Sequence, residues 1–409
     1  MRILLLVERL PYPELDGYGL RFAHHLKRLA ARHEVDVLTY DVGELVPELE
    51  LALGQVERVR TVEPPRQGLV RRAADAFTER GLHHRYPAFA EAVRRRASRG
   101  RYDVAWVGGW RMAQYMDELG GVPAVLDATD DEVLAAKRAL ANARGPLERA
   151  QRYRDVLVHA RYQKHHFRSA SVCLFVTETD AASTRARMPG LRCEVLSNGV
   201  DTDHFACDAG FSPLAPSAAP TIVFEGSMSF APNVEAAIHL VRDVLPLVRA
   251  AVPGTRAMIV GRHPTPEVRA LAGDGVEVTG SVDDVRPYLA AATVSVSPML
   301  SGAGIKNKIL QAWSMGRPVV ATTVSTGGLN ARSGRELLIA DGAEGVAQAC
   351  VDVIRSPELA AELGRAGREA VVSRYSWLDC TARLERWLEA GRDAKVGARA
   401  AHAPREREA

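Results

Sequence analysis

The sequence predicts an α/β protein made of two domains, each built on a parallel sheet wrapped by helices. Short apolar runs of strand length alternate with longer segments of helical period. This alternation begins again after Asn198-Gly199, and a stretch over 208–220, rich in Ala, Pro and Ser, separates the two series. We therefore expect an amino-terminal domain over 1–200, a carboxyl-terminal domain over 201–375, a closing helix over 376–392 and a disordered tail over 393–409.

The expected strands follow from the apolar runs in chain order. The first run stops at Glu8-Arg9 and no small-residue cleavage site follows, so we interpret it as a buried strand rather than a signal peptide. In the first half the strands are 3–7, 35–38, 56–62, 104–107, 122–126 and 172–176; in the second half they are 222–224, 258–260, 276–278, 294–296, 319–321 and 337–339.

Composition excludes several classes of function. Hydrophobic residues make up 47% of the 409 residues and charged residues 25%, as in ordinary globular domains. The net charge of +3 gives no global argument for nucleic acid. Five widely spaced cysteines, without a C-x-x-C pair, predict neither a zinc knuckle nor a disulfide framework and fit a reducing cytoplasm. No apolar run reaches the ~18 to 20 residues of a membrane span. We expect a cytoplasmic protein without metal or cofactor.

A glycine-containing turn follows the first strand. Gly17 and Gly19 precede an apolar helical face, at the sheet edge where free helix N–H groups attract anions. These glycines would let a phosphate come close to the backbone. A tight strand-to-helix turn also needs glycine for conformational reasons alone, so both interpretations stay open. The apolar face of the helix consists of Phe22, Leu26, Leu29 and Ala30.

The most informative segment, 301–321, combines a glycine loop, a helix, a glycine stop and a strand. Lys306 and Lys308 lie in the expected first turn of this helix, where positive charge is unfavourable beside the helix dipole unless an anion is bound. Lys308 and Gln311 share a helical face. An anionic ligand resolves the conflict; two solvated lysines are the alternative.

Three motifs in the same order carry a resemblance to a known family. They are Gln311-Ala312-Trp313-Ser314-Met315-Gly316-Arg317-Pro318-Val319-Val320, the crossing segment Asn198-Gly199-Val200-Asp201, and Arg374-Tyr375-Ser376-Trp377. The chain resembles the retaining GT-B glycosyltransferases of the GT4-like group, glycosyl transferases group 1. The resemblance implies two Rossmann-like domains with parallel sheets facing a cleft, and a closing helix that crosses back to the amino-terminal domain.

The resemblance also implies a function and a site. A nucleotide-sugar donor would bind mostly to the carboxyl-terminal domain and a sugar, lipid-linked or small-molecule acceptor to the amino-terminal domain. Transfer (EC 2.4 class) would retain the anomeric configuration without a metal, as in bacterial polysaccharide or glycoconjugate biosynthesis. Lys308, assisted by Lys306, would neutralise the charge that grows on the β-phosphate. The remaining implied donor contacts are Gly17, Gly19, Gly226, Ser229, Gly304, Gln311 and Gly328.

The chain departs from the family pattern at several positions. Ala303 and Gln311 stand where the family often has two glutamates. The resemblance implies that the amide oxygen of Gln311 would take over the ribose contact of the second glutamate. The segment after the fourth strand lacks the family's histidine. Asp130, just past the fifth strand, is the candidate catalytic carboxylate facing the acceptor, with a solvated or helix-capping role as the alternative. Asp127 is similarly ambiguous. The motifs select neither nucleobase, sugar nor acceptor.

Other interpretations compete with this one. Asp201 and Asp203 form a D-x-D, the metal signature of GT-A enzymes, although carboxylates beside a glycine turn usually cap it. Basic runs over 94–101 and 161–168 fit either contact with acidic lipids at the inner membrane face or solvated helix faces. His24 and His25 are expected to face solvent. A degenerate nucleotide-sugar-binding or scaffold protein is the alternative function; an epimerase would need an acid and base pair that the sequence does not offer.

Overall fold

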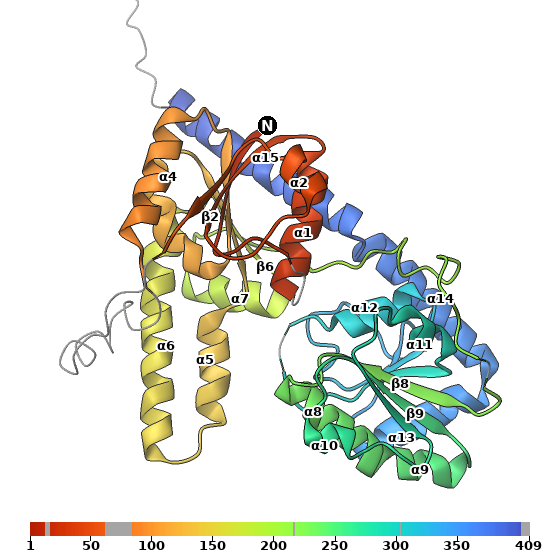
Figure 1. The fold of residues 1–409 in the computed structure, drawn as a ribbon. Helices are drawn as coiled ribbons and strands as arrows, with labels where there is room; N and C mark the ends of the chain where they lie inside the picture. The colour runs from red at the N-terminus through yellow and green to blue at the C-terminus, as the bar shows by residue number, and fades with distance from the viewer. Residues whose placement is uncertain (13–16, 62–83, 216, 303, 402–409) are drawn as a thin grey trace, which may run out of the picture. The chain divides into compact units, whose positions relative to one another are not determined.

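The computed structural model describes residues 1–12, 17–61, 84–215, 217–302 and 304–401. The chain forms two compact units (Figure 1). The first joins Met1–Leu196 to Thr381–Ala409, and the second is Ser197–Cys380. Each unit has a parallel sheet covered by helices, as the alternation of apolar runs and helical periods predicts. The expected α/β class with two Rossmann-like sheets is confirmed.

In the described part of the first unit the sheet has seven strands in the order β3-β2-β1-β4-β5-β6-β7. Its central strands are mostly apolar and buried, because helices cover both faces of a parallel sheet. In β1, Leu4 and Leu6 face one core cluster and Ile3 and Leu5 face another. The strands are β1 Arg2–Val7, β2 Glu34–Tyr40, β3 Val56–Val59, β4 Val104–Gly108, β5 Ala124–Thr129, β6 Val172–Phe175 and β7 Cys193–Val195.

Helices of the first unit cover this sheet and include the last helix of the chain. They are α1 Gly17–Ala30, α2 Pro47–Ala52, α4 Pro87–Arg99, the 3-10 helix η2 Trp110–Leu119, α5 Glu132–Ala141, α6 Pro146–His166, the 3-10 turn η3 Phe167–Ser169, α7 Glu178–Arg187 and α15 Trp377–Ala401. Helix α15 continues beyond the expected end at residue 392, and the last part of the expected tail, 402–409, lies outside the described residues.

Packing of α15 corrects one expectation. Leu384 and Leu388 of this helix join the core cluster that contains Phe22 and Leu26 of α1. His25, expected to face solvent, is instead fully buried, and its Nδ1 lies 2.9 Å from Thr381 Oγ1. The expectation was wrong because a segment more than 350 positions away along the chain covers this face of α1.

In the described part of the second unit the sheet has six strands in the order β10-β9-β8-β11-β12-β13. The strands are β8 Thr221–Glu225, β9 Arg256–Val260, β10 Val276–Gly280, β11 Val294–Ser297, β12 Val319–Ala321 and β13 Leu338–Ile339. The helices are α8 Ala231–His239, the π-helical turn η4 Leu240–Val244, α9 Leu245–Ala251, α10 Pro266–Arg269, α11 Arg286–Ala291, α12 Asn307–Ser314, α13 Gly342–Arg355 and α14 Pro357–Arg374.

Both sheets reverse their strand order at one place. In the first unit the reversal lies between β1 and β4, and in the second unit between β8 and β11. Connections on either side of such a point lead away to opposite faces of the sheet, which leaves a crevice at the carboxyl ends of the two strands. Ligands of open α/β sheets bind in this crevice. The fold therefore directs attention to the loops after β8 and β11.

Glycines on α14 let α12 pack very close to it. A Cβ atom on Gly364 would lie 2.3 Å from the carbonyl oxygen of Gly316, and one on Gly367 would lie 2.5 Å from the ring of Trp313. Trp313 is fully buried as a result. This packing fixes the carboxyl end of α12, and hence the direction in which its first turn points toward the crevice.

Candidate functional site

The loops that follow β8 and β9 form one edge of the crevice in the second unit. The Gly226 N–H donates to the carbonyl of Val260 over 2.9 Å, and the Met228 N–H donates to the carbonyl of Arg262 over 2.9 Å. A Cβ on Gly261 would lie only 1.7 Å from the oxygen of Gly226. The two loops thus run side by side at a separation that only glycine at position 261 permits.

Lys308 lies where the loops after β8 and β11 meet. Its Nζ donates to Asn233 Oδ1 over 2.8 Å and lies 4.2 Å from the centre of the Phe224 ring and 3.8 Å from Met299 Sδ. These contacts come from β8, from α8 and from the loop after β11, so the ammonium occupies the switch point itself. Among the described residues, none of these partners is a carboxylate.

Burial sets the charge state of this lysine. Desolvation lowers the pKa of Lys308 to about 8, the charge of Glu225 opposes this shift and the charge of Lys306 adds to it. Glu225 ends β8, and its own pKa is raised because burial disfavours the carboxylate. Its Oε1 is shielded from solvent and has no hydrogen-bond partner among the described residues. The crevice therefore holds a desolvated ammonium and a desolvated carboxyl group.

Asn233, near the start of α8, links the lysine to the loop after β8. Its Nδ2 donates to the carbonyl of Ser227 over 2.9 Å while its Oδ1 accepts from Lys308, and the residue is only 8% exposed. A Cβ on Gly226 would lie 2.8 Å from Asn233 Nδ2 and 3.1 Å from Lys308 Nζ. A side chain at position 226 would therefore displace the Asn233 amide, and the φ of 156° also favours glycine.

Buried hydroxyl groups hold the loops after β11 and β12. Thr322 Oγ1 donates to the carbonyl of Met299 over 2.7 Å, and Ser325 Oγ accepts from the Met299 N–H over 3.3 Å and from Ser297 Oγ over 3.1 Å. Burial strengthens such networks because no water competes for the donors. They fix Met299, and with it one wall of the space around Lys308.

The other predicted donor residues have different surroundings. Lys306 is the N-cap residue of α12, one position before the helix, and its Nζ lies 3.2 Å from the carbonyl of Gly304. Gly304 and Gly328 have φ angles of 73° and 87°, in the left-handed region that favours glycine. Gln311 is partly buried on α12. The structure thus brings Lys308 and Gly226 together and places Lys306 against Gly304. Ser229 is exposed, with its Oγ 3.2 Å from Ser227 Oγ.

In the first unit, Gly17 and Gly19 form the first turn of α1 and have helical backbones, while the preceding residues 13–16 lie outside the described part. Asp130 follows β5 directly after Thr129, whose φ of 66° is unusual for a β-branched residue. The pKa of Asp130 is raised by desolvation and by the nearby charge of Asp180.

The carboxylates on either side of Asp130 have structural partners. Asp127 is fully buried, and Arg21 donates to both of its oxygens over 2.8 and 2.9 Å. Asp131 caps α5 by accepting from the Val133 N–H, and it also pairs with Arg187 at 2.7 Å. The ambiguity left for Asp127 is thereby resolved in favour of a core ion pair. The helix-capping role considered for Asp130 belongs to its neighbour.

Sequence reasoning did not single out Asn233, Glu225 or the pairing of Arg21 with Asp127. For Asn233 a signal was present, because a polar residue in the first turn after a strand and glycine loop lies at the ligand edge of an α/β sheet. For Glu225 the signal was a carboxylate ending an otherwise apolar strand. For Arg21 no local signal exists, since its partner lies 106 positions away in the chain.

The D-x-D segment forms a turn in which its first carboxylate accepts backbone hydrogen bonds. Asp201 Oδ1 accepts from the N–H groups of Asp203 and His204 over 3.2 and 3.0 Å. In the part of the chain that is described, one other group has metal-ligand character: atoms of Asp117, His165 and His166 lie within 4.8 Å of one another. That group belongs to η2 and the end of α6, far in sequence from the crevice residues.

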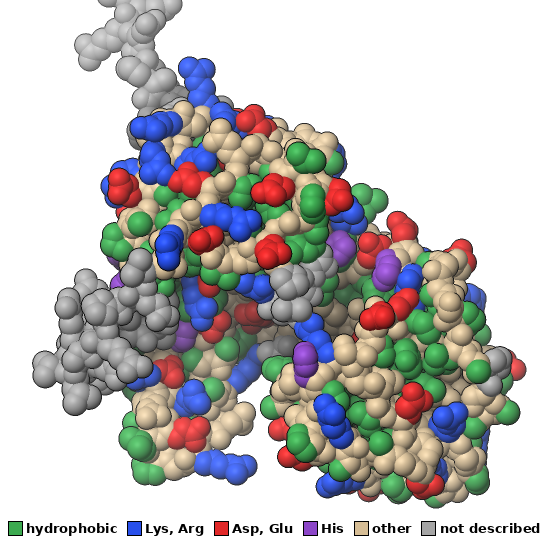
Figure 2. Space-filling model, in the orientation of Figure 1, with side chains coloured by type: hydrophobic (Ala, Val, Ile, Leu, Met, Phe, Trp, Pro, Cys, Tyr) green, Lys and Arg blue, Asp and Glu red, His purple; other side chains and the backbone are tan. Residues whose placement is uncertain are grey.

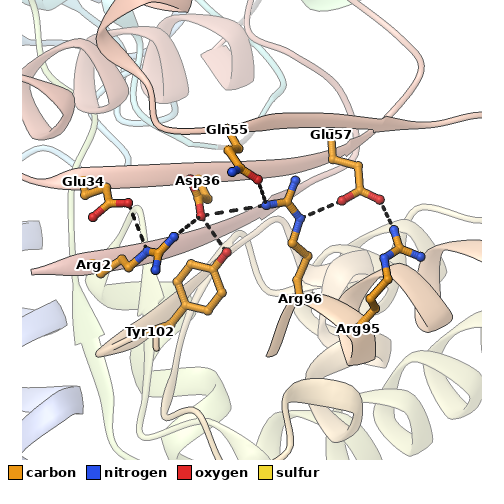
Figure 3. A network of polar contacts seen from close by, with 8 residues as sticks. All are labelled: Arg2, Glu34, Asp36, Gln55, Glu57, Arg95, Arg96 and Tyr102. Carbon is orange, nitrogen blue, oxygen red and sulfur yellow. Dashed lines mark hydrogen bonds and ion pairs between the residues drawn. The ribbon is translucent and has the colours of Figure 1, made fainter. Parts of the chain in front are cut away.

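The basic run after residue 94 is paired with acidic side chains. Arg96 contacts Glu57 over 2.6 Å and Gln55 over 2.5 Å, and Arg95 also pairs with Glu57 (Figure 3). Asp36, which is 1% exposed, accepts from Tyr102 over 2.6 Å in the same network. On the face drawn in Figure 2, Lys and Arg side chains are interspersed with Asp and Glu. These ion pairs neutralise much of the charge of the run. Neither sequence interpretation, contact with acidic lipids or a solvated helix face, included them.

The family model for glycosyl transferases group 1 matches residues 219–356, which contain every crevice residue described above. This segment of the second unit is therefore similar to the glycosyl transferases group 1 family. A solved structure of HepE from Anabaena in complex with UDP and glucose is similar over 95% of this chain and 99% of that chain, with a TM-score of 0.66 and 15% identity. At this identity the likeness concerns the fold, which is GT-B. The resemblance to GT-B, GT4-like glycosyltransferases predicted from the motifs is confirmed by the family-model match over 219–356 and by the fold.

Curated relatives match a smaller part of the chain. A phosphatidyl-myo-inositol mannosyltransferase of Mycolicibacterium smegmatis is 30% identical over 203 residues, 47% of this chain and 51% of the relative. A GDP-mannose-dependent alpha-(1-6)-phosphatidylinositol monomannoside mannosyltransferase of Mycobacterium tuberculosis is 30% identical over 230 residues, 50% of this chain and 58% of the relative. The chain spans about half the length of the curated relatives it matches.

One finding bears on the membrane. Within the described residues of this chain, every helix is too short or too polar to cross a bilayer.

Proposed function

We propose that this chain is a glycosyltransferase of the EC 2.4 class that moves a sugar from a nucleotide-sugar donor to an acceptor. The observation that carries the proposal is the Lys308 ammonium, held at the switch point of a glycosyl transferases group 1 domain without a carboxylate partner among the described residues. A cation in such a position fits the diphosphate of a nucleotide-sugar.

The proposed reaction retains the anomeric configuration and uses no metal. The bond between the anomeric carbon and the β-phosphate oxygen breaks, and its electron pair goes to the phosphate. Lys308, with Lys306 nearby, stabilises the growing negative charge more than it stabilises the ground state. The acceptor oxygen bonds to the same face of the anomeric carbon, and its proton goes to the leaving phosphate. No enzymic base is required, so Asp130 would orient the acceptor rather than deprotonate it.

Relatives and neighbours suggest the substrate classes. HepE was solved with UDP and glucose, and the mycobacterial relative is named for GDP-mannose and a phosphatidylinositol monomannoside. We propose a nucleotide-diphosphate sugar as donor and a sugar or lipid-linked acceptor, bound mainly by the first unit. A lipid-linked acceptor would require peripheral contact with the inner face of the membrane, and the basic residues not already ion-paired would serve that contact.

Donor turnover tests the proposal. The purified chain is incubated with UDP-glucose, UDP-N-acetylglucosamine and GDP-mannose, and nucleotide release is measured with and without lipid and sugar acceptors. We expect one donor to be consumed, and NMR of the product to reveal retained configuration. Binding of UDP or GDP without release of nucleotide from any donor would favour the degenerate binding protein instead. Absence of both binding and release would refute the function.

A further inference from the structure

Lys308 is held by a neutral amide, although a buried lysine more often pairs with a carboxylate. Asn233 Oδ1 accepts from its Nζ over 2.8 Å, and the Phe224 ring lies 4.2 Å below. Both partners stabilise the cation, yet neither carries a charge that would cancel it. Glu225, the carboxyl group from β8, acts on Lys308 through its charge but forms no ion pair with it among the described residues.

The amide of Asn233 has a second bond that fixes its orientation. Because Nδ2 donates to the carbonyl of Ser227, the oxygen of the amide must point toward Lys308. A side chain at position 226 would collide with both groups. The loop after β8, the first turn of α8 and the first turn of α12 are thus joined through one side chain.

We propose that Asn233 is the positioning residue of the proposed donor site: its neutral amide holds the Lys308 ammonium against the glycine loop and leaves the positive charge available to a diphosphate. This inference rests on the proposed function for the identity of the anion, but the arrangement of Asn233 and Lys308 can be tested separately. The amide solves a specific problem, because a carboxylate in its place would hold the lysine equally well and also neutralise it.

Two substitutions distinguish the contact that holds the Lys308 ammonium from the neutralisation of its charge. Asn233→Asp keeps the shape of the side chain and adds a negative charge beside Lys308, whereas Asn233→Ala removes the contact. We expect each to weaken binding of UDP, GDP and inorganic pyrophosphate by about tenfold at about pH 8, measured by calorimetry. Asn142→Asp, exposed at the end of α5, is the control for added charge and should bind as the parent chain does.

The two variants should shift the titration of Lys308 in opposite directions. Acetic anhydride modifies only the neutral amine, so the extent of acetylation against pH, read by mass spectrometry, follows the ammonium directly. Relative to a midpoint near 8 in the parent chain, Asn233→Asp should move it up and Asn233→Ala should move it down. Glu225 and Lys306, the charged groups facing Lys308 from β8 and from the preceding loop, are unchanged in both variants. A merely structural asparagine would not produce opposite shifts.

The outcomes distinguish the two proposals. Opposite labelling shifts together with weaker binding in both variants support the positioning role. If the parent chain binds none of the three anions while the labelling shifts occur, the donor site fails and the arrangement around Lys308 stands. If the midpoint is unchanged in Asn233→Asp, whose near-identical shape preserves the fold, the positioning role is overturned whatever the binding data give. Thermal melting monitored by circular dichroism verifies that each variant is folded.

Discussion

A lysine packed over an aromatic ring and partly withdrawn from water loses hydration that a bound anion can replace. Lys308 is in this position. We expect Lys308→Met to weaken UDP and GDP binding about 10- to 100-fold, because a charge-assisted contact is lost, as calorimetry would measure. The melting temperature should stay equal or rise, since a desolvated charge is removed. Lys137→Met, exposed on α5, is the charge control. Unchanged binding in Lys308→Met would remove this residue from the donor site.

The pKa of Lys308 gives this binding a pH dependence. Because desolvation lowers the pKa to about 8, the amine is charged below that pH and neutral above it. Diphosphate affinity should therefore be full near pH 7 and fall as the pH rises through about 8, well before an ordinary lysine with a pKa near 10.4 would lose its proton. Lys308→Arg should retain affinity up to about pH 10, since guanidinium stays protonated. A pH-independent affinity in the parent chain would contradict the assignment.

The ion pair of Arg21 with Asp127 is expected to support the first unit. Both side chains are at most 1% exposed, and breaking such a pair leaves a buried charge without its partner. We expect Asp127→Asn to lower the free energy of unfolding by about 3–5 kcal/mol, measured by urea denaturation. Glu34→Gln breaks a pair with Arg2 whose side chains are 54% and 35% exposed, and should cost only about 0–1 kcal/mol. Equal effects of the two substitutions would refute the structural role.

At the scale of single residues, the sequence predicts those roles that depend on neighbouring positions in the chain. Lys306 and Gly304 belong to one continuous loop, so their contact follows from the local chain itself. Asn233 reaches Lys308 only because β8 and β11 are neighbours in the sheet, a relation that spans 75 positions of chain. Its role depends on tertiary register, which no local pattern in a single sequence encodes.

Close approach of α12 to α14 depends on two glycines. Because a Cβ on Gly367 would lie 2.5 Å from the Trp313 ring, Gly367→Ala should cost about 1–3 kcal/mol of stability, seen as a lower melting temperature. Gly345 of α13 offers a matched control, because its Cβ would meet only Ala340 at 3.7 Å. Gly345→Ala should be neutral or stabilise by about 0.5–1 kcal/mol, as alanine favours a helix over glycine. Identical effects at both positions would contradict the packing argument.

Elements with a clear apolar pattern can be predicted from the sequence, whereas the shortest strand and the end of the last helix cannot. The five consecutive apolar residues 3–7 predict a buried strand, and β1 includes all of them. Strand β7, only Cys193–Val195, has too few residues for a pattern and was missed. The sequence at the end of the last helix has no clear apolar periodicity, so the sequence does not predict that this helix continues to Ala401. Its packing on α1, which buries His25, depends on the return of the chain to the first unit.

At the scale of the whole chain, the two sheets share one strand order. The order β3-β2-β1-β4 in the first sheet corresponds to β10-β9-β8-β11 in the second. The sequence predicts two sheets because its apolar pattern begins again after residue 199, and the parallel order follows from the alternation with helices. It does not predict which loops meet, because that depends on where each sheet reverses direction. The reversal between β8 and β11 is what turns two separate glycine loops into one candidate site.

We propose that charge supplied by the protein itself takes the place of a metal ion in the proposed reaction. A GT-A type enzyme offsets diphosphate charge with a cation held by a D-x-D, but here Asp201 is occupied by the N–H groups of Asp203 and His204. Lys308 and Lys306 supply positive charge within the second unit. Transfer should therefore proceed equally with excess EDTA and with added Mg²⁺ or Mn²⁺. Asp203→Asn should leave the rate and this indifference unchanged, whereas Lys308→Met should not be rescued by any divalent cation. A rate that falls in EDTA and returns with Mn²⁺ would overturn the metal-independent mechanism while leaving the glycosyltransferase fold untouched.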